Sequence, residues 1–209
     1  MSLTHQPSMW DVAEEPRLTA LAGRVVRHQL GSGAWVDHLP GWVEGSDAVL
    51  DVLLGDIGWR ADRRQVYDRE VAVPRLLRWF GAGETLPHDL LTRARDALDT
   101  HYRDDLGEPF VSAGMCLYRD GRDSVAWHGD RIGRGATQDT LVAIVSFGSP
   151  RALMLRPVGG GASRRFPVGH GDLVVMGGSC QRTWEHCVPK TAQPVGPRVS
   201  VQFRPRGVA

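Results

Sequence analysis

The chain has 209 residues, of which 42% are hydrophobic and 23% charged, and its 25 Lys+Arg nearly balance its 24 Asp+Glu, giving a formal net charge of +1. This composition is typical of a single soluble globular domain and excludes a protein that coats nucleic acid through its overall charge, while allowing a local basic groove. Three cysteines without a C-x-x-C pair favour a reducing compartment. We see no secretory signal pattern and no apolar run of about 20 residues, so we expect a cytoplasmic protein with no membrane partner and no evident protein partner.

Hydrophobic periodicity and turn residues divide the N-terminal half into extended segments and two helices. Ser46 and Asp47 offer a cap for the first helix, and Leu90, Leu91 and Leu98 fall on one face of the second. The predicted segments, in chain order, are a loosely ordered 1–22, a strand at 23–28, an extended stretch at 35–43, a helix at 48–54, extended segments at 59–87 and a helix at 88–102.

After Pro109 the pattern changes to short strands separated by Gly and Pro turns. The predicted strands are 113–118, 125–128, 141–147, 152–155, 165–168, 172–176 and 198–204. Seven short strands of this kind indicate a β-sandwich or jelly roll. We therefore expect one α+β, mainly β domain over 1–209, with a jelly-roll core at about 109–204 and the N-terminal helices packed on one side.

A candidate metal site lies in the strand-like segment at His128 and Asp130. Residues two apart in a strand project from the same face, so both side chains can reach one ion, and His186 is the leading candidate for a third ligand. Two His and one carboxylate leave positions open for other ligands, as in non-haem Fe(II) oxygenases, whereas zinc sites more often have four protein ligands or hold one water. The alternative is a surface His bonded to a neighbouring Asp.

A candidate anion site lies near the C-terminus, where Arg198 and Arg204 share one face of a strand opposite the apolar Val199, Val201 and Phe203. Two inward-facing arginines are costly unless each meets an anion, and bidentate pairing with the two carboxylates of 2-oxoglutarate is a natural match. The alternative is an edge strand whose arginines face solvent.

Several segments together resemble the AlkB-type dealkylating dioxygenases. They are PRLLRWFG at 74–81, YRDGRDSVAWHGD at 118–130, VSFG at 145–148, HGDLVVMGG at 170–178, WEHCVPK at 184–190 and RVSVQFR at 198–204. The ordered set H-x-D, W-x-H-x-x-P-K and R-x5-R is specific to this family, and the resemblance covers roughly residues 74–204.

The resemblance implies a double-stranded β-helix (jelly-roll) fold with Fe(II) as cofactor and 2-oxoglutarate and O₂ as co-substrates. It implies that His128, Asp130 and His186 bind the metal, and that Arg198 and Arg204 hold 2-oxoglutarate with a hydrogen bond from Tyr118. It also implies a substrate-binding lid at about 59–87. The implied activity is oxidative dealkylation of N-alkylated bases in DNA or RNA, which releases aldehyde, succinate and CO₂.

The chain departs from the family pattern at three places. Cys116 and Ser200 stand where family members usually carry Asn, and Ser200 is carried over as a co-substrate contact. The iron motif often continues with acidic residues that read the base, whereas here Arg131 and Arg134 follow it. Arg131 is therefore a candidate substrate contact.

A base that reacts at the iron must leave its stack, and an aromatic side chain can then hold it. Trp79 and Phe80 are the candidates, with core packing as the alternative. Arg75 is a candidate phosphate contact, together with other arginines of the lid, and a solvated surface is the alternative reading for these. The other lid arginines are Arg60, Arg63, Arg64, Arg69 and Arg78. We expect His170, which precedes a tight turn, to make a structural hydrogen bond.

Three other functions compete with base dealkylation. A 2-oxoglutarate oxygenase acting on tRNA, protein or a small molecule would keep the same cofactor site. An inactive jelly-roll binding module would bind no Fe(II), and a structural zinc site would hold zinc tightly without any dependence on 2-oxoglutarate.

Overall fold

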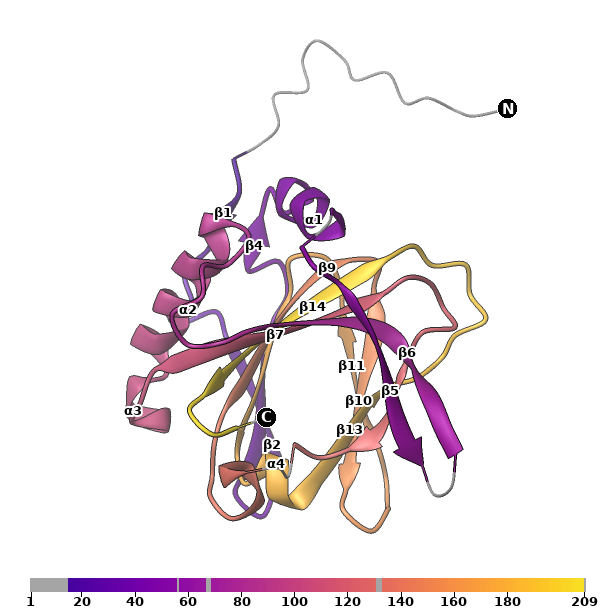
Figure 1. Cartoon of the computed structure of the whole chain (residues 1–209). Coiled ribbons are helices and arrows are strands. Elements are labelled where there is room, and N and C mark those ends of the chain that lie inside the picture. Colours follow the sequence, from indigo (N-terminus) through magenta and orange to yellow (C-terminus); the bar gives the residue numbers. More distant parts are fainter. Residues whose placement is uncertain (1–14, 56, 67–68, 131–132, 209) are drawn as a thin grey trace, which may run out of the picture.

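A computed structural model of the chain describes residues 15–55, 57–66, 69–130 and 133–208. Its core consists of an eight-stranded and a four-stranded antiparallel sheet (Figure 1). The larger sheet has the order β2-β3-β12-β9-β14-β7-β6-β5 and the smaller one β11-β10-β13-β8, and β1 pairs with β4. The strands are β1 (Arg17–Leu18), β2 (Val26–Gly31), β3 (Ala34–Leu39), β4 (Val43–Glu44), β5 (Arg60–Val66), β6 (Arg69–Phe80), β7 (Phe110–Tyr118), β8 (Val125–His128), β9 (Val142–Gly148), β10 (Arg151–Pro157), β11 (Arg164–Val168), β12 (Leu173–Gly178), β13 (Trp184–Val188) and β14 (Arg198–Pro205).

Helices α1 and α2 cover one face of the larger sheet, the smaller sheet lies on the opposite side, and Cys180 of α4 joins the cluster between the sheets (Figure 1). They are α1 (Asp47–Leu54), α2 (Asp89–His101), α3 (Arg103–Leu106) and α4 (Cys180–Thr183), with a short 3₁₀ turn η1 (Arg134–Ala136). Leu90, Leu91 and Leu98 of α2 are fully buried against the sheet, as their helical spacing predicts. The jelly roll with helices packed on one side is therefore confirmed.

Strand β14 separates two apolar clusters because its side chains alternate between the faces of the larger sheet. Val199, Val201 and Phe203 point toward the helices and join the main core. Arg198 and Arg204 lie on the other face, toward the smaller sheet, where a second apolar cluster includes Ile144 of β9 and Leu155 of β10. The polar face of this strand is thus enclosed between the two sheets.

The structure differs from the sequence-based expectation at the N-terminus. Residues 1–14 lie outside the described residues, but the rest of the expected loose segment includes β1, which pairs with β4. Arg17 forms an ion pair of 2.5 Å with Glu44, and the backbone N–H of Thr19 donates to the carbonyl of Trp42 at 2.9 Å. The expected strand at 23–28 begins later, at Val26, because Gly23 adopts a turn with φ of +74°.

The capping prediction holds for the position but not for the hydrogen bond. Ser46 is the residue before α1, yet its side chain makes no capping hydrogen bond. In α2, by contrast, the ring of His88 accepts a hydrogen bond of 3.0 Å from the backbone N–H of Leu90. His88 therefore caps α2, although Ser, Thr, Asp and Asn are the residues usually preferred at this position.

Two features of the strands go beyond the sequence-based expectation. The extended segments expected at 59–87 include β5 and β6, which pair as a long hairpin and add to the edge of the larger sheet. Residues 184–188 form β13, which places His186 in a regular strand between β10 and β8. Trp184 packs in the cluster between the sheets.

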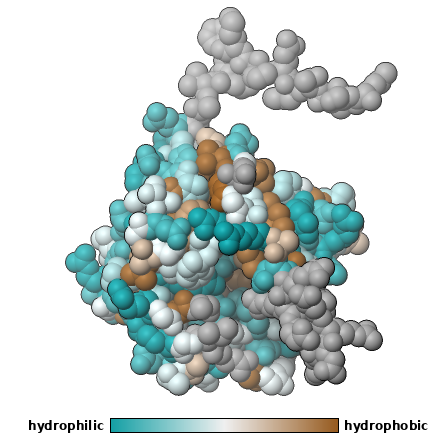
Figure 2. Space-filling model, in the orientation of Figure 1, coloured by the Kyte–Doolittle hydropathy of each residue, from teal (hydrophilic) through white to brown (hydrophobic). Residues whose placement is uncertain are grey.

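The visible surface in Figure 2 is mostly hydrophilic. Apolar side chains gather chiefly around α1, where Val52 and Leu54 are exposed. Within the described residues, no helix has both the length and the hydropathy that a membrane crossing requires.

We expect Phe203→Ala to lower the free energy of unfolding by about 3–5 kcal/mol, because it removes a fully buried ring from the core behind β14. Val26→Ala, at a side chain that is 54% exposed, is the control and should change stability by less than about 0.5 kcal/mol. Urea unfolding of both variants measures the difference. Equal stabilities would contradict the assignment of Phe203 to the core.

Candidate active site

A cavity of about 540 Å³ lies between the two sheets. Its floor is the polar face of β14, which contributes Arg198, Ser200, Gln202 and Arg204. The other walls come from both sheets and from the β5–β6 hairpin. Further lining residues are Arg60, Arg75, Leu77, Arg78, Trp79, Gly114, Met115, Cys116, Tyr118, Val125, His128, Asp130, Val142, Ile144, Leu153, Val168, Val174, Met176, His186 and Val188.

The three predicted metal ligands meet at one point of this cavity. His128 ends β8 and is the direct antiparallel partner of His186 in β13, so that their ring centroids lie 4.2 Å apart. Asp130 follows two residues later, with its Oδ1 at 3.7 Å from Nε2 of His128. Ligand atoms of all three residues lie within 4.8 Å of one another.

The protonation states of these residues suit a metal. Burial is the largest cause that lowers the pKa of His186, to about 3, so its imidazole is neutral at neutral pH and keeps a lone pair for coordination. Burial disfavours the charged form of Asp130, but its charged surroundings, Arg204 foremost, outweigh burial and hold the pKa of this carboxyl below its ordinary value. The donor set therefore includes the neutral imidazole of His186 and the carboxylate of Asp130, together with the ring of His128.

This donor set fits a divalent ion of the non-haem iron type. Bonds of about 2.0–2.2 Å to a common ion place donor atoms roughly 3–4 Å apart, close to the separations found here. Two His and one carboxylate on one side of the ion leave the other positions free for small ligands. Among the described residues, this trio is the cluster of His, Cys, Asp or Glu side chains that can hold a metal.

The two predicted clamp arginines serve different ends of the cavity. Nη2 of Arg204 lies 3.3 Å from Oδ2 of Asp130, so this guanidinium is beside the metal ligands. Arg198 lies at the other end, where its Nε donates to Oγ of Ser146 at 2.8 Å and its guanidinium carbon is 5.2 Å from the ring centroid of Tyr118. Six residue steps along an extended strand separate the two Cα atoms by about 20 Å.

The Arg198 end carries an excess of buried positive charge. Arg198 is 3% exposed, and its Nη1 has no hydrogen-bond partner within the described residues. Burial lowers the pKa of this guanidinium, and burial together with the neighbouring Cys116 raises the pKa of Tyr118 to about 12. Arg151 lies 5.7 Å from the Tyr118 ring centroid. A buried guanidinium with an unused donor and a neutral phenol beside it fit a carboxylate ligand.

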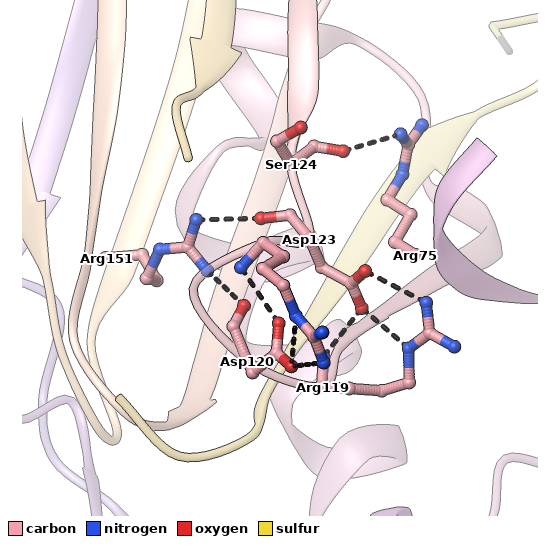
Figure 3. A network of polar contacts seen from close by, with 7 residues as sticks. Arg75, Arg119, Asp120, Asp123, Ser124 and Arg151 are labelled. Carbon is pink, nitrogen blue, oxygen red and sulfur yellow. Dashed lines mark hydrogen bonds and ion pairs between the residues drawn. The ribbon is translucent and has the colours of Figure 1, made fainter. Parts of the chain in front are cut away.

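Arg151 holds the loop between β7 and β8 (Figure 3). Arg151 donates from its guanidinium to the backbone carbonyls of Asp120, Asp123 and Pro189, at 3.1, 2.8 and 2.6 Å. The loop is thus joined to the segment that follows β13. Arg151 therefore joins the loop before β8, the strand of His128, to the segment after β13, the strand of His186.

Four side chains predicted to contact substrate have different surroundings. Trp79 is 44% exposed and lines the cavity, with the guanidinium carbon of Arg204 at 5.9 Å from its ring centroid. Phe80 is not brought to the cavity, since it is 6% exposed and packs in the core behind the larger sheet. Arg75 is buried and its Nη1 donates to the carbonyl of Ser124 at 3.2 Å (Figure 3). Arg131 lies outside the described residues.

Other predicted residues also have defined partners. Arg78 donates to the carbonyl of Ile57 at 3.1 Å and pairs with Glu84 at 3.2 Å. The Nδ1 atom of His170 accepts a hydrogen bond of 2.7 Å from the backbone N–H of Gly148, which confirms a structural role. The side chains of Arg63, Arg64 and Arg69 lie outside the described residues.

Sequence reasoning missed Gln202, Ser146 and Arg151. The alternation along 198–204 does place Gln202 on the same face as the two arginines, so this signal was present in the sequence. Ser146 and Arg151 belong to other strands, and only the pairing of β9 with β14 and the packing of β10 bring them to the Arg198 end. No local pattern identifies such contacts.

A family model described as "2OG-Fe(II) oxygenase superfamily" matches residues 48–204 of this chain. The chain is 30% identical over 198 residues to human "Alpha-ketoglutarate-dependent dioxygenase alkB homolog 3", covering 80% of this chain and 66% of that protein. It therefore spans just under two thirds of the length of this relative. It is 33% identical over 135 residues to the Arabidopsis thaliana "DNA oxidative demethylase ALKBH2", covering 53% of this chain and 42% of that one.

The fold has a counterpart among solved structures. The structure of OsALKBH1 aligns with a TM-score of 0.59 and 14% sequence identity, covering 85% of this chain and all of that chain. At this level of identity the likeness concerns the fold, which agrees with the jelly roll described above.

We expect His186→Gln to weaken Mn(II) binding by more than about tenfold, because even the loss of an outer partner of a metal ligand typically costs about 10–100-fold in affinity. Titration of Mn(II) followed by electron paramagnetic resonance measures the affinity. His170→Gln is the matched control and should bind Mn(II) as the wild type does, since His170 lies outside the ligand cluster. A similar loss in both variants would contradict the assignment.

Proposed function

Because the chain belongs to the 2OG-Fe(II) oxygenase superfamily, whose members use Fe(II), 2-oxoglutarate and O₂, we propose that it oxidatively dealkylates N-alkylated bases in DNA or RNA. The products are the restored base, an aldehyde, succinate and CO₂. The observation that carries the proposal is the enclosure, in one cavity, of a two-His-one-carboxylate cluster and a buried arginine with an unused donor. The relatives named as a DNA oxidative demethylase and as an alkB homologue support a nucleic-acid substrate.

His128, Asp130 and His186 would hold the iron. When bound, Fe(II) together with 2-oxoglutarate and O₂ supplies the oxidation that hydroxylates the N-alkyl carbon, while the co-substrate loses CO₂ to become succinate. Arg204 keeps Asp130 in its charged, coordinating form. The apolar side chains between the sheets, such as Ile144 and Leu155, limit the water around the reacting groups.

At the other end of the cavity, Arg198 and Tyr118 would bind the distal carboxylate of 2-oxoglutarate. Arg198 offers a charged donor and Tyr118, with its raised pKa, stays a neutral hydroxyl donor at neutral pH. Ser200 lies between this end and the metal ligands and contributes a hydroxyl to the same face. These contacts orient the co-substrate with its 2-oxo acid end toward the metal.

Trp79 is the proposed stacking partner of the flipped-out or single-stranded base. It lies at the cavity with part of its ring exposed, and one base–aromatic stack contributes about 1–3 kcal/mol. Arg131 and Arg75 remain proposed contacts to the substrate, Arg75 from within the cavity wall. The β5–β6 hairpin that carries Arg75 and Trp79 is the proposed lid.

A cytoplasmic location belongs to the same proposal and is supported by three cysteines without a disulfide.

The direct test is demethylation of a single-stranded oligonucleotide with N1-methyladenine or N3-methylcytosine, followed by mass spectrometry. With Fe(II), 2-oxoglutarate and O₂ we expect loss of one methyl group per turnover, and none with His128→Ala. Succinate production without demethylation would overturn base repair and favour an oxygenase that acts on tRNA, protein or a small molecule. The absence of any succinate would favour an inactive binding module or a structural zinc site.

We expect Trp79→Ala to raise the KM for the methylated oligonucleotide by about 5- to 100-fold, which corresponds to the loss of one base stack. The affinity for 2-oxoglutarate should not change, and Trp79→Phe should retain most of the oligonucleotide affinity. Steady-state kinetics of the three proteins provide the comparison. An unchanged KM in Trp79→Ala would remove this side chain from the base-binding site.

A further inference from the structure

Gln202 lies at the centre of the cavity floor, between the two functional arginines. Its Nε2 donates to Oγ of Ser200 at 2.8 Å and to Sγ of Cys116 at 3.3 Å. Its Oε1 accepts from Nη2 of Arg204 at 3.1 Å. The opposite amide orientation would turn an NH₂ group toward the guanidinium, which has no acceptor, so these partners fix the orientation of the amide.

The contact with Arg204 determines how that guanidinium is presented to the cavity. Nη2 of Arg204 is shared by two acceptors, Oε1 of Gln202 and Oδ2 of Asp130. Nε of Arg204 is buried and has no hydrogen-bond partner among the described residues. Both residues line the cavity, so the guanidinium of Arg204 is held beside the metal ligands.

Two neighbours complete the position of Arg204. Gly114 in β7 is the register partner of Gln202, and a Cβ built there would lie 2.8 Å from Nη1 of Arg204 and 3.3 Å from the ring of Trp79. The guanidinium therefore packs closely over a glycine. Gln202 supplies the polar contact on one edge of the guanidinium, and Gly114 supplies the space.

We propose that Gln202 is a positioning residue for 2-oxoglutarate, because it holds the guanidinium of Arg204 against Asp130 at the cavity wall, where a co-substrate carboxylate would meet it. This inference rests on the proposed function. The amide also joins Cys116 and Ser200, the two positions at which this chain departs from the resembling family, into one connected polar floor. Gln202 thus provides an amide beside Cys116 and Ser200, the two positions at which the resembling family usually carries Asn.

The test is the affinity of the Mn(II)-loaded protein for 2-oxoglutarate, measured by titration calorimetry without Fe(II), so that no turnover occurs. Gln202→Leu keeps the approximate volume but removes the donor and the acceptor, and we expect about tenfold weaker binding, the typical effect of one lost hydrogen bond to a charged group. Gln29→Leu, at an exposed glutamine of β2, is the matched control and should bind as the wild type does. Mn(II) affinity and Tm should be equal in the two variants.

A second measurement is the rate at which iodoacetamide alkylates Cys116, which lines the cavity. Of the three cysteines, Cys116 is the one among the cavity-lining residues, so bound 2-oxoglutarate should slow its alkylation by iodoacetamide but not that of Cys180 or Cys187. Gln202→Leu should need about tenfold more 2-oxoglutarate for the same protection. Cys116→Asn in the Gln202→Leu background restores an amide beside Ser200 and should recover part of the calorimetric affinity, whereas a role in packing alone would not be rescued.

The outcomes separate this inference from the function on which it rests. A wild type that binds no 2-oxoglutarate would overturn the proposed function and this inference with it. Normal binding by both the wild type and Gln202→Leu would leave the function in place and overturn the role of Gln202. Weaker binding accompanied by an equal loss of Mn(II) affinity and a lower Tm would make Gln202 a structural residue and would also overturn it. If Gln202→Leu does not fold, Gln202→Glu replaces it, and 2-oxoglutarate affinity equal to the wild type would contradict the inference.

Discussion

The alternation of side chains along β14 is the constraint on which the rest of the site depends. Three apolar residues anchor the strand in the core beneath the helices, and this anchoring turns Arg198, Ser200, Gln202 and Arg204 into the space between the sheets. A shift of one residue in the pairing with β7 or β9 would bury the arginines against the helices and turn Phe203 into the cavity. The apolar core therefore fixes the chemistry of the cavity as well as the stability of the fold.

The same arrangement makes the cavity strongly electropositive at one end and balanced at the other. Arg204 is matched by Asp130, so the charge beside the metal ligands is partly neutralised. Arg198 donates to Ser146 and lies beside Tyr118, neither of which is a carboxylate, and Arg151 directs its donors to backbone carbonyls. Burying such a charge is unfavourable without an anion. A bound dicarboxylate would supply that anion, so its pairing with Arg198 would stabilise the complex.

Local sequence patterns predicted most of the fold and the metal trio. A strand with alternating side chains and an H-x-D pair can both be recognised from residues that are close together in the sequence. These patterns could not predict the partners of Arg198 and Arg204, since Ser146 and Asp130 reach these arginines only through strand pairing and the approach of the two sheets. Phe80 shows the same limit: an aromatic residue adjacent to Trp79 points to the opposite face of β6 and belongs to the core. The regular strand around His186 was missed because only five residues, between a helical turn and a proline, form it.

The most direct measurement of the central claim, that one cavity holds the metal and 2-oxoglutarate together, is anaerobic visible absorption of the Fe(II)-loaded protein. Addition of 2-oxoglutarate should produce the weak metal-to-ligand charge-transfer band that requires the 2-oxo acid to coordinate the iron. Arg198→Met should still bind Fe(II) but need more 2-oxoglutarate for the same band, and Arg206→Met, at an exposed arginine, should behave as the wild type. A protein that binds Fe(II) yet shows no band at any 2-oxoglutarate concentration would contradict the account.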